Sequence, residues 1–225
     1  MDWQISALLT GEYYCEKIAA LTRSAVDELV ALSDRVTVRD EYTAGKIFEA
    51  LLKTGIGMSF ARNSRPASGS EHIISHLLEC KELQQGKLPN LHGEDVGVCT
   101  LEMLKYYRYL AEHESIQTDS ESVDWEDIFA FYGNMAEDVK KLNFPDNVID
   151  KVDKDVLKDR WSEIRAIIQS IPNYETCRTA MERAHCKLTV ADIGKDQALF
   201  DACVKYSPYM RHRLTLLRLK DMIKI

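Results

Sequence analysis

Apolar residues recur at steps of three and four along almost the whole chain, and this pattern constrains the fold more than any other feature. Between residues 12 and 32 the stripe consists of Tyr14, Ile18, Leu21, Ala25, Leu29 and Leu32. That step places the side chains on one face of an α-helix. Similar patterns predict helices over residues 40–61, 71–83, 92–113, 125–141, 155–171, about 173–186, 195–206 and 209 onward, with a short helix opened by Pro145.

Strand-like sequence is nearly absent. Only R-V-T-V-R at 35–39 alternates in the manner of a strand, and it is too short and isolated to build a sheet. The chain contains 10 glycines and 5 prolines in 225 residues, which favours long helices over a turn-rich β architecture. No repeat or linker divides it. We therefore expect residues 1–225 to form one all-α domain, a bundle of roughly eight to ten helices at ordinary helix length.

Composition excludes several classes of function. The net charge of -7 argues against nucleic-acid binding and against an anionic membrane surface. No apolar run approaches the ~20 residues of a membrane span, and the N-terminus does not read as a signal peptide. The six cysteines are scattered without a C-x-x-C pair, which is typical of a reducing compartment. We expect a cytoplasmic protein with no nucleic-acid partner and no membrane insertion.

Two glycines interrupt the helical pattern of residues 40–61. Gly55 and Gly57 each weaken a helix by about 1 kcal/mol relative to alanine, so they suggest a close approach by another helix or a ligand. G-I-G alone is a weak nucleotide-binding signal, because no strand precedes it. Helix packing is the better interpretation.

The stretch A-R-N-S-R-P-A-S-G-S-E-H-I-I-S-H-L-L-E-C, residues 61–80, combines a polar loop with two histidines. His72 and His76 lie at i and i+4, on one side of their helix, and His92 could meet them if the two helices form a hairpin. Converging neutral imidazoles suit Zn²⁺ or Fe²⁺. The alternative is a pair of solvent-facing histidines. The sequence does not identify a particular acid as a further metal ligand. Glu71 is expected to point to a different face of the helix.

The loop before the first histidine could hold an anion. Arg65 carries a fork suited to phosphate, and Asn63, Ser64 and Ser68 add short polar groups. Gly69 leads into the start of a helix, where backbone N–H groups favour negative charge. The alternative is a solvated arginine and an ordinary helix N-cap.

The order of these pieces resembles one family. S-R-P-A-S-G-S-E-H-x-x-S-H at 64–76 followed by H-G-x-x-V-G-x-x-T from 92 is similar to the sn-glycerol-1-phosphate dehydrogenases. These belong with the iron-dependent alcohol dehydrogenases, glycerol dehydrogenases and dehydroquinate synthases. T-G-E-Y-Y-C at 10–15, G-x-x-M-S-F-A-x-N-S at 55–64 and Y-M-R-H-R-L-T-L-L at 209–217 extend the resemblance over most of the chain.

The resemblance implies a two-domain enzyme, of which residues 1–225 match only the C-terminal helical half. NAD or NADP would bind through an N-terminal α/β domain that is missing here. The family's metal, Zn²⁺ or alternatively Fe²⁺ or Ni²⁺, is held by an aspartate and two histidines. The histidines carry over to His72 and His92, whereas the aspartate would precede Met1. Asp2 matches a family position that is not the ligand.

The implied reaction is metal-assisted reduction of dihydroxyacetone phosphate by NAD(P)H to sn-glycerol 1-phosphate. Asn63, Ser64, Arg65 and Ser68 would bind the substrate, and His76 would orient it or relay a proton. The expected partners are a small phosphorylated substrate and the nucleotide-binding domain, without which the chain alone should be inactive. A homodimer, a non-catalytic interaction module, and a relative acting on another polyol or phosphorylated substrate stay open as alternatives.

Overall fold

The computed structural model describes residues 1–225, and helices account for 69% of them. The prediction of a mostly helical chain is confirmed. The α-helices are α1 Asp2–Thr10, α2 Glu16–Ala31, α3 Glu41–Ala61, α4 Ser70–Gln84, α5 His92–Glu112, α6 Trp125–Tyr132, α7 Ala136–Asn143, α8 Lys154–Asp159, α9 Trp161–Gln169, α10 Tyr174–Arg183 and α11 Gln197–Tyr206. None of them combines the length and the apolar character that crossing a bilayer requires.

Short elements complete the chain. The 3-10 turns are η1 Ser33–Val38, η2 Arg65–Ala67, η3 Gly133–Met135, η4 Val148–Lys151, η5 Ser207–Tyr209 and η6 Leu217–Leu219. Two strands, β1 Gln117–Thr118 and β2 Ile223–Lys224, pair antiparallel. The strand-like residues 35–39 belong to η1 and its end, so they build no sheet, as expected. The six cysteines are free.

Two of the expected helices are divided. Residues 125–141 form α6 and α7, because Gly133 has a φ of 61°, which an α-helix cannot contain. Residues 155–171 form α8 and α9, which meet at Arg160. Asp124 caps α6 as expected, since its side chain accepts from the backbone N–H groups of Glu126 and Asp127.

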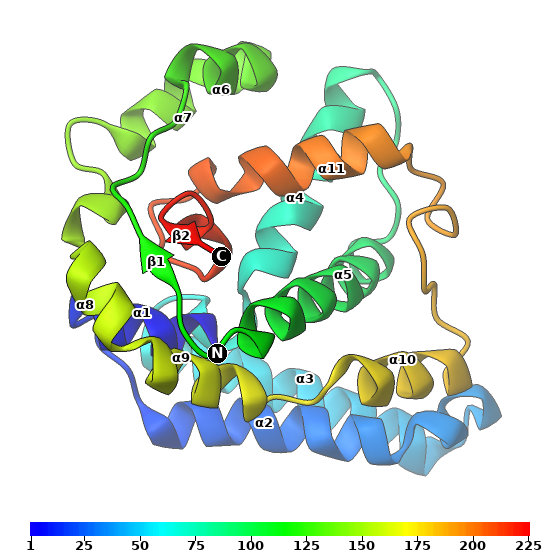
Figure 1. Cartoon of the computed structure of the whole chain (residues 1–225). Helices are drawn as coiled ribbons and strands as arrows, with labels where there is room; N and C mark the ends of the chain where they lie inside the picture. Colours follow the sequence, from blue (N-terminus) through cyan, green and yellow to red (C-terminus); the bar gives the residue numbers. More distant parts are fainter.

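The segment after Tyr209 is the centre of the molecule. The helix predicted there is wrong, because the chain instead runs through η6 into β2. Its side chains belong to the core cluster that α1, α4, α5, α9 and α11 also supply. Figure 1 shows this red segment surrounded by β1, α11, α4 and α5. Residues 214–219 are buried without interruption, so they need no one-sided apolar stripe, and the helical period therefore misjudged this part of the chain. The buried apolar side chains after Tyr209 are Leu214, Leu216, Leu217, Leu219, Met222 and Ile223.

The helices α2 and α3 form a long hairpin along one edge of the molecule (Figure 1). A Cβ atom on Gly57 would lie 3.2 Å from Cγ2 of Thr22 in α2, so the two helices approach closely there. A Cβ on Gly55 would meet nothing within 4 Å. The close approach inferred from the two glycines is therefore confirmed for Gly57 and wrong for Gly55.

The outer face of α3 is apolar and exposed. It presents side chains that are each at least 48% exposed, namely Phe48, Leu51, Leu52, Ile56 and Phe60.

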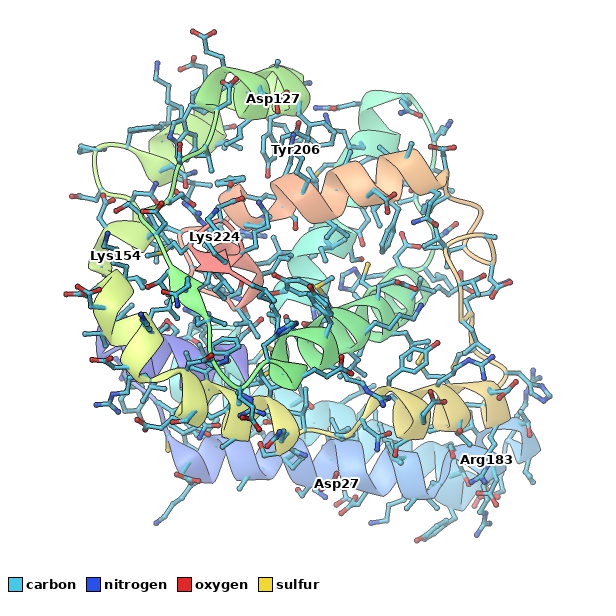
Figure 2. The ribbon with its side chains drawn as sticks, in the orientation of Figure 1. Asp27, Asp127, Lys154, Arg183, Tyr206 and Lys224 are labelled. Carbon is cyan, nitrogen blue, oxygen red and sulfur yellow. The ribbon has the colours of Figure 1, made fainter.

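Polar contacts fix the helices that carry the histidines. Lys195, which is 2% exposed at its side chain, lies 2.5 Å from Glu82 of α4 and 3.4 Å from Asp95 of α5. This buried cation holds the α4–α5 hairpin together. On another face, Tyr206 of α11 donates to Asp127 of α6 at 2.6 Å, and Figure 2 labels both residues.

Candidate metal centre

Three imidazoles meet where α4 faces the start of α5. The ring of His92 lies with its centroid 4.8 Å from that of His76, nearly parallel to it, and 5.4 Å from that of His72. His72 and His76 follow one another on the same side of α4, and His92 is the first residue of α5. The structure thus brings the three histidines into one cluster through the hairpin that the sequence suggested.

Two carboxylates hold these rings. Glu79 Oε1 lies 2.5 Å from His92 Nδ1, and its Oε2 lies 3.2 Å from His76 Nδ1. Glu71 Oε1 lies 2.7 Å from His72 Nδ1. The expectation that Glu71 points to a different face is therefore wrong, because its side chain folds back over the first turn of α4, where it also accepts from the N–H of Gly69 at 2.9 Å.

The ionisation of both acids follows from these contacts. Burial would raise the pKa of the Glu79 carboxyl, but the hydrogen bonds from His92 and His76 outweigh it and lower that pKa. For Glu71, burial likewise opposes the hydrogen bond from His72, and the pKa is again lowered. Ionised carboxylates only accept, so each Nδ1 carries the donated proton and each Nε2 has no protein partner.

The cluster offers donors that a divalent transition metal prefers. One ligand atom each from His76, Glu79 and His92 lies within 4.8 Å of the other two. Imidazole nitrogen and carboxylate oxygen suit Zn²⁺, Fe²⁺ and Ni²⁺. All three side chains are partly exposed, so a further ligand can reach the group. These residues fit a bound metal.

Glu79 was missed by the sequence analysis, although a signal exists. It lies three residues after His76 and seven after His72, which places it on the same side of α4. The second helix decides its importance, because only the packing of α5 brings His92 to it.

Arg65 faces the interior of the protein. Its Nε and Nη2 donate to the two oxygens of Glu12, at 2.8 and 2.5 Å, and its Nη1 donates to the carbonyl of Leu214 at 2.6 Å. Asn63 accepts from the N–H of Arg65 and donates to the carbonyl of Ala61, so it shapes the loop. This geometry matches neither expectation for Arg65, because its guanidinium is not an open fork for a phosphate and is not solvated.

The two loop serines contact a different arginine. Ser64 Oγ accepts from Arg213 Nη2 at 2.8 Å, and the carbonyl of Ser68 accepts from its Nη1 at 3.0 Å. Arg213 lines a pocket of about 380 Å³ together with Asn63, Arg65, Lys151 and His212, among others. Burial, and then the nearby charges of Arg65 and Arg211, lower the pKa of Arg213. The loop therefore borders a concentration of positive charge.

Asp2 is occupied by structural contacts. Its Oδ2 accepts from both the N–H and the hydroxyl of Ser70 at the start of α4, at 2.8 and 2.9 Å, and its Oδ1 accepts from the N–H of Leu216 at 2.9 Å. The side chain thus ties α4 to the central segment, and both of its oxygens are occupied by these contacts.

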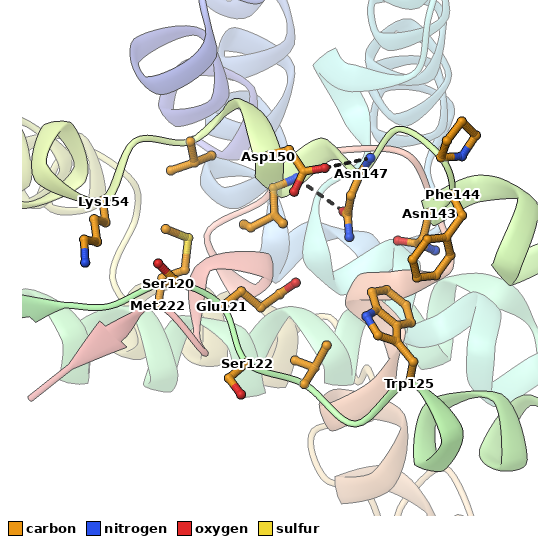
Figure 3. Close-up of a pocket in the computed structure, with 14 residues that line it drawn as sticks. Ser120, Glu121, Ser122, Trp125, Asn143, Phe144, Asn147, Asp150, Lys154 and Met222 are labelled. Atoms are coloured by element: carbon orange, nitrogen blue, oxygen red, sulfur yellow. Dashed lines mark hydrogen bonds between the residues drawn. The ribbon is translucent and has the colours of Figure 1, made fainter.

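A larger pocket, of about 640 Å³, contains none of the predicted site residues. Figure 3 shows its lining, where Trp125 faces Phe144 and Glu121 lies below Asn147 and Asp150. Glu121 is neutralised by the buried guanidinium of Arg218. This pocket provides no cluster of metal-binding side chains.

Comparison with known proteins gives consistent results. Over 109 residues the chain is 40% identical to glycerol-1-phosphate dehydrogenase (NAD(P)+) of Bacillus licheniformis, a match that covers 48% of this chain and 27% of that protein. A protein of the same name from Geobacillus stearothermophilus is 26% identical over 222 residues, covering 96% of this chain and 48% of that protein. The chain thus spans at most about half the length of these relatives. No family model matches it.

Proposed function

The chain is related to the glycerol-1-phosphate dehydrogenases, and on that basis we propose that it forms the metal- and substrate-binding half of an oxidoreductase of this type. Residues 1–225 would be the helical domain of a dehydroquinate synthase-like dehydrogenase. In the complete enzyme, NAD(P)H would deliver a hydride to the carbonyl carbon of dihydroxyacetone phosphate and a proton would add to the oxygen. The product would be sn-glycerol 1-phosphate.

The observation that carries this proposal is the histidine cluster. It contains His72 and His92, the positions at which the family's ligands are expected, and adds His76, whose ring stacks on that of His92. Glu71 and Glu79 hold the rings through Nδ1, so the imidazoles keep a fixed orientation. A bound Zn²⁺, Fe²⁺ or Ni²⁺ would supply Lewis-acid polarisation of a substrate oxygen.

The phosphate of the substrate would be recognised beside the same loop. Arg213 is held by Ser64 and Ser68, and the nearby charges of Arg65 and Arg211 lower its pKa, although Glu12 pairs with Arg65. A phosphate dianion would relieve that repulsion, and a planar guanidinium can bind it with two hydrogen bonds. In this proposal Arg65 supports the loop through Glu12, while Arg213 takes the contact with phosphate that the sequence suggested for Arg65.

A chimaera tests the proposal. Residues 1–225 would replace the matching half of the Geobacillus stearothermophilus relative, and oxidation of NADH or NADPH would be followed with dihydroxyacetone phosphate. We expect activity in the chimaera, its loss on His92→Ala, and no change on His113→Ala, since His113 lies at the far end of α5. The 225 residues alone should be inactive, because their only sheet has two short antiparallel strands and offers no dinucleotide site.

Two results would redirect the proposal. A folded chimaera that binds Zn²⁺ but does not oxidise either cofactor would favour a non-catalytic interaction module. Turnover could also be faster with glycerol, or with a phosphorylated substrate other than dihydroxyacetone phosphate. That result would favour a different member of the same superfamily.

A further inference from the structure

We propose that the outer face of α3 is a dimer interface, against which a second copy of this chain packs its own α3 in the antiparallel direction. The face lies opposite the residues that α3 buries against the rest of the chain, such as Ala50 and Gly57. Along its middle runs a stripe of exposed residues at steps of four and three, namely Glu41, Gly45, Phe48, Leu52, Gly55 and Ser59. Such a seven-residue period is typical of a helix that packs along a second helix at a shallow angle.

The stripe is symmetric about residue 50. The large apolar residues Phe48 and Leu52 lie two positions from that point, the two glycines five positions and the two polar residues nine positions. When a second helix lies antiparallel with a two-fold axis at residue 50, each residue meets its counterpart of the same kind, so the surface is self-complementary. A parallel pair needs no such symmetry and would place the two Glu41 carboxylates together, where like charges repel.

The two glycines of the stripe have no packing role within the chain. A Cβ atom on Gly45 or on Gly55 would meet nothing within 4 Å. In the antiparallel pair Gly45 lies opposite Gly55 of the second copy, which leaves a hollow on each side of the central layer of large apolar residues. Helical side chains lean toward the N-terminus of their own helix, so the ring of Phe48 extends into the hollow beside Gly45. The alternation of large and small residues therefore lets the two helices interlock.

The charges at the ends of the stripe are also complementary. Glu41 and Arg62 are both exposed and form no ion pair within the chain. In the antiparallel pair Glu41 lies opposite Ser59 of the second copy, and Arg62 of that copy, three residues further on, comes within reach. The lysines of α3 are instead turned toward α2, where both lie beside Glu28, so they do not oppose the approach of a second copy.

The area of the face is sufficient for a weak dimer. Its five large apolar side chains are 48–72% exposed. A fully covered aromatic side chain buries about 150–250 Å², so the five leave roughly 500 Å² of contiguous apolar surface in each chain. Patches of a few hundred Å² mark interaction sites. Two copies would bury about 1,000 Å², the lower limit of a specific interface, so we expect a dissociation constant in the micromolar range.

Sedimentation equilibrium of the 225-residue chain tests the interface, over concentrations from about 1 to about 200 µM that bracket this range. Phe48→Glu and Leu52→Lys each place a charge opposite an apolar side chain, and each alone should weaken association by at least about tenfold. Leu88→Glu is the control, because Leu88 is 92% exposed and lies outside α3. This variant should dimerise like the wild type.

A mixture of the two α3 variants tests the antiparallel arrangement. In one mixed dimer the carboxylate introduced at position 48 meets the ammonium group introduced at position 52 of the other copy, while the remaining Leu52 meets Phe48. The mixture should therefore associate at least about tenfold more tightly than either variant alone. A parallel pair would not bring positions 48 and 52 together, so it predicts no recovery.

Circular dichroism would verify that each variant is folded. Association links chains that are already folded, so far below the dissociation constant the variants should unfold like the wild type. A wild type that is monomeric at about 200 µM would overturn the inference, as would a dimer that neither α3 variant weakens. Weakening without recovery in the mixture would exclude the antiparallel arrangement. None of these results depends on metal or substrate, so the proposed function is tested separately.

Discussion

At the scale of single residues, Arg65 shows how much of the loop chemistry is structural. Its side chain is 5% exposed and joins its loop to two distant parts of the chain, the N-terminal segment through Ser6 and Glu12 and the central segment through the carbonyl of Leu214. A buried guanidinium without its carboxylate keeps an uncompensated charge, so removing one partner is more harmful than the net stabilisation of the pair suggests.

We predict that Glu12→Gln lowers the free energy of unfolding by about 2 kcal/mol, less than for a fully buried pair because Glu12 is partly exposed. Glu16→Gln, an exposed acid four residues later without an ion pair, should change it by less than about 0.5 kcal/mol. Urea denaturation of the two variants checks the difference. Equal stabilities would mean that the ion pair is dispensable.

The sequence predicted which polar residues lie near the site, but it could not predict their partners. Arg65 pairs with an acid 53 positions away and Arg213 contacts serines about 145 positions away, so both contacts depend on tertiary packing. The histidine cluster was accessible because its spacing is local to one helix and one short hairpin. Glu79 shares that spacing. Including it in the predicted site would have required knowing which face of α4 the helix α5 covers.

At the scale of helices, Gly55 and Gly57 form a matched pair. Both lie within α3, but only Gly57 lies against α2. We predict that Gly55→Ala stabilises the protein by up to about 1 kcal/mol, because alanine favours the helix and its methyl group meets open space. Gly57→Ala should stabilise less or destabilise, since its methyl group would crowd Thr22 at 3.2 Å. Thermal unfolding would measure both, and a larger gain from Gly57→Ala would contradict the packing.

The periodicity of apolar residues predicted where the helices lie, but it predicted less accurately where each helix ends. The period continues through Gly133 and Arg160 because the flanking helices bury neighbouring parts of the same core. The chain turns there without interrupting the apolar pattern, so only the backbone conformation reveals the boundary.

At the scale of the whole molecule, the central segment should dominate stability. Leu217 is 2% exposed and lies within the core cluster, whereas Leu52 on α3 is 50% exposed. We predict that Leu217→Ala lowers the free energy of unfolding by about 2–5 kcal/mol through the cavity it leaves. Leu52→Ala should change it by less than about 0.5 kcal/mol. Chemical denaturation distinguishes them, and similar losses for the two would show that the segment is not the core.

The central position of residues 214–222 has a consequence for how the protein is made. In the order of synthesis these residues follow every helix that they contact in the core. A nascent chain that has already released α4 and α5 from the ribosome therefore still lacks the side chains on which those helices pack. Its apolar faces stay uncovered for that interval, during which such surfaces are prone to aggregation. Chaperones that cover those faces, or rapid completion of translation, would reduce this exposure.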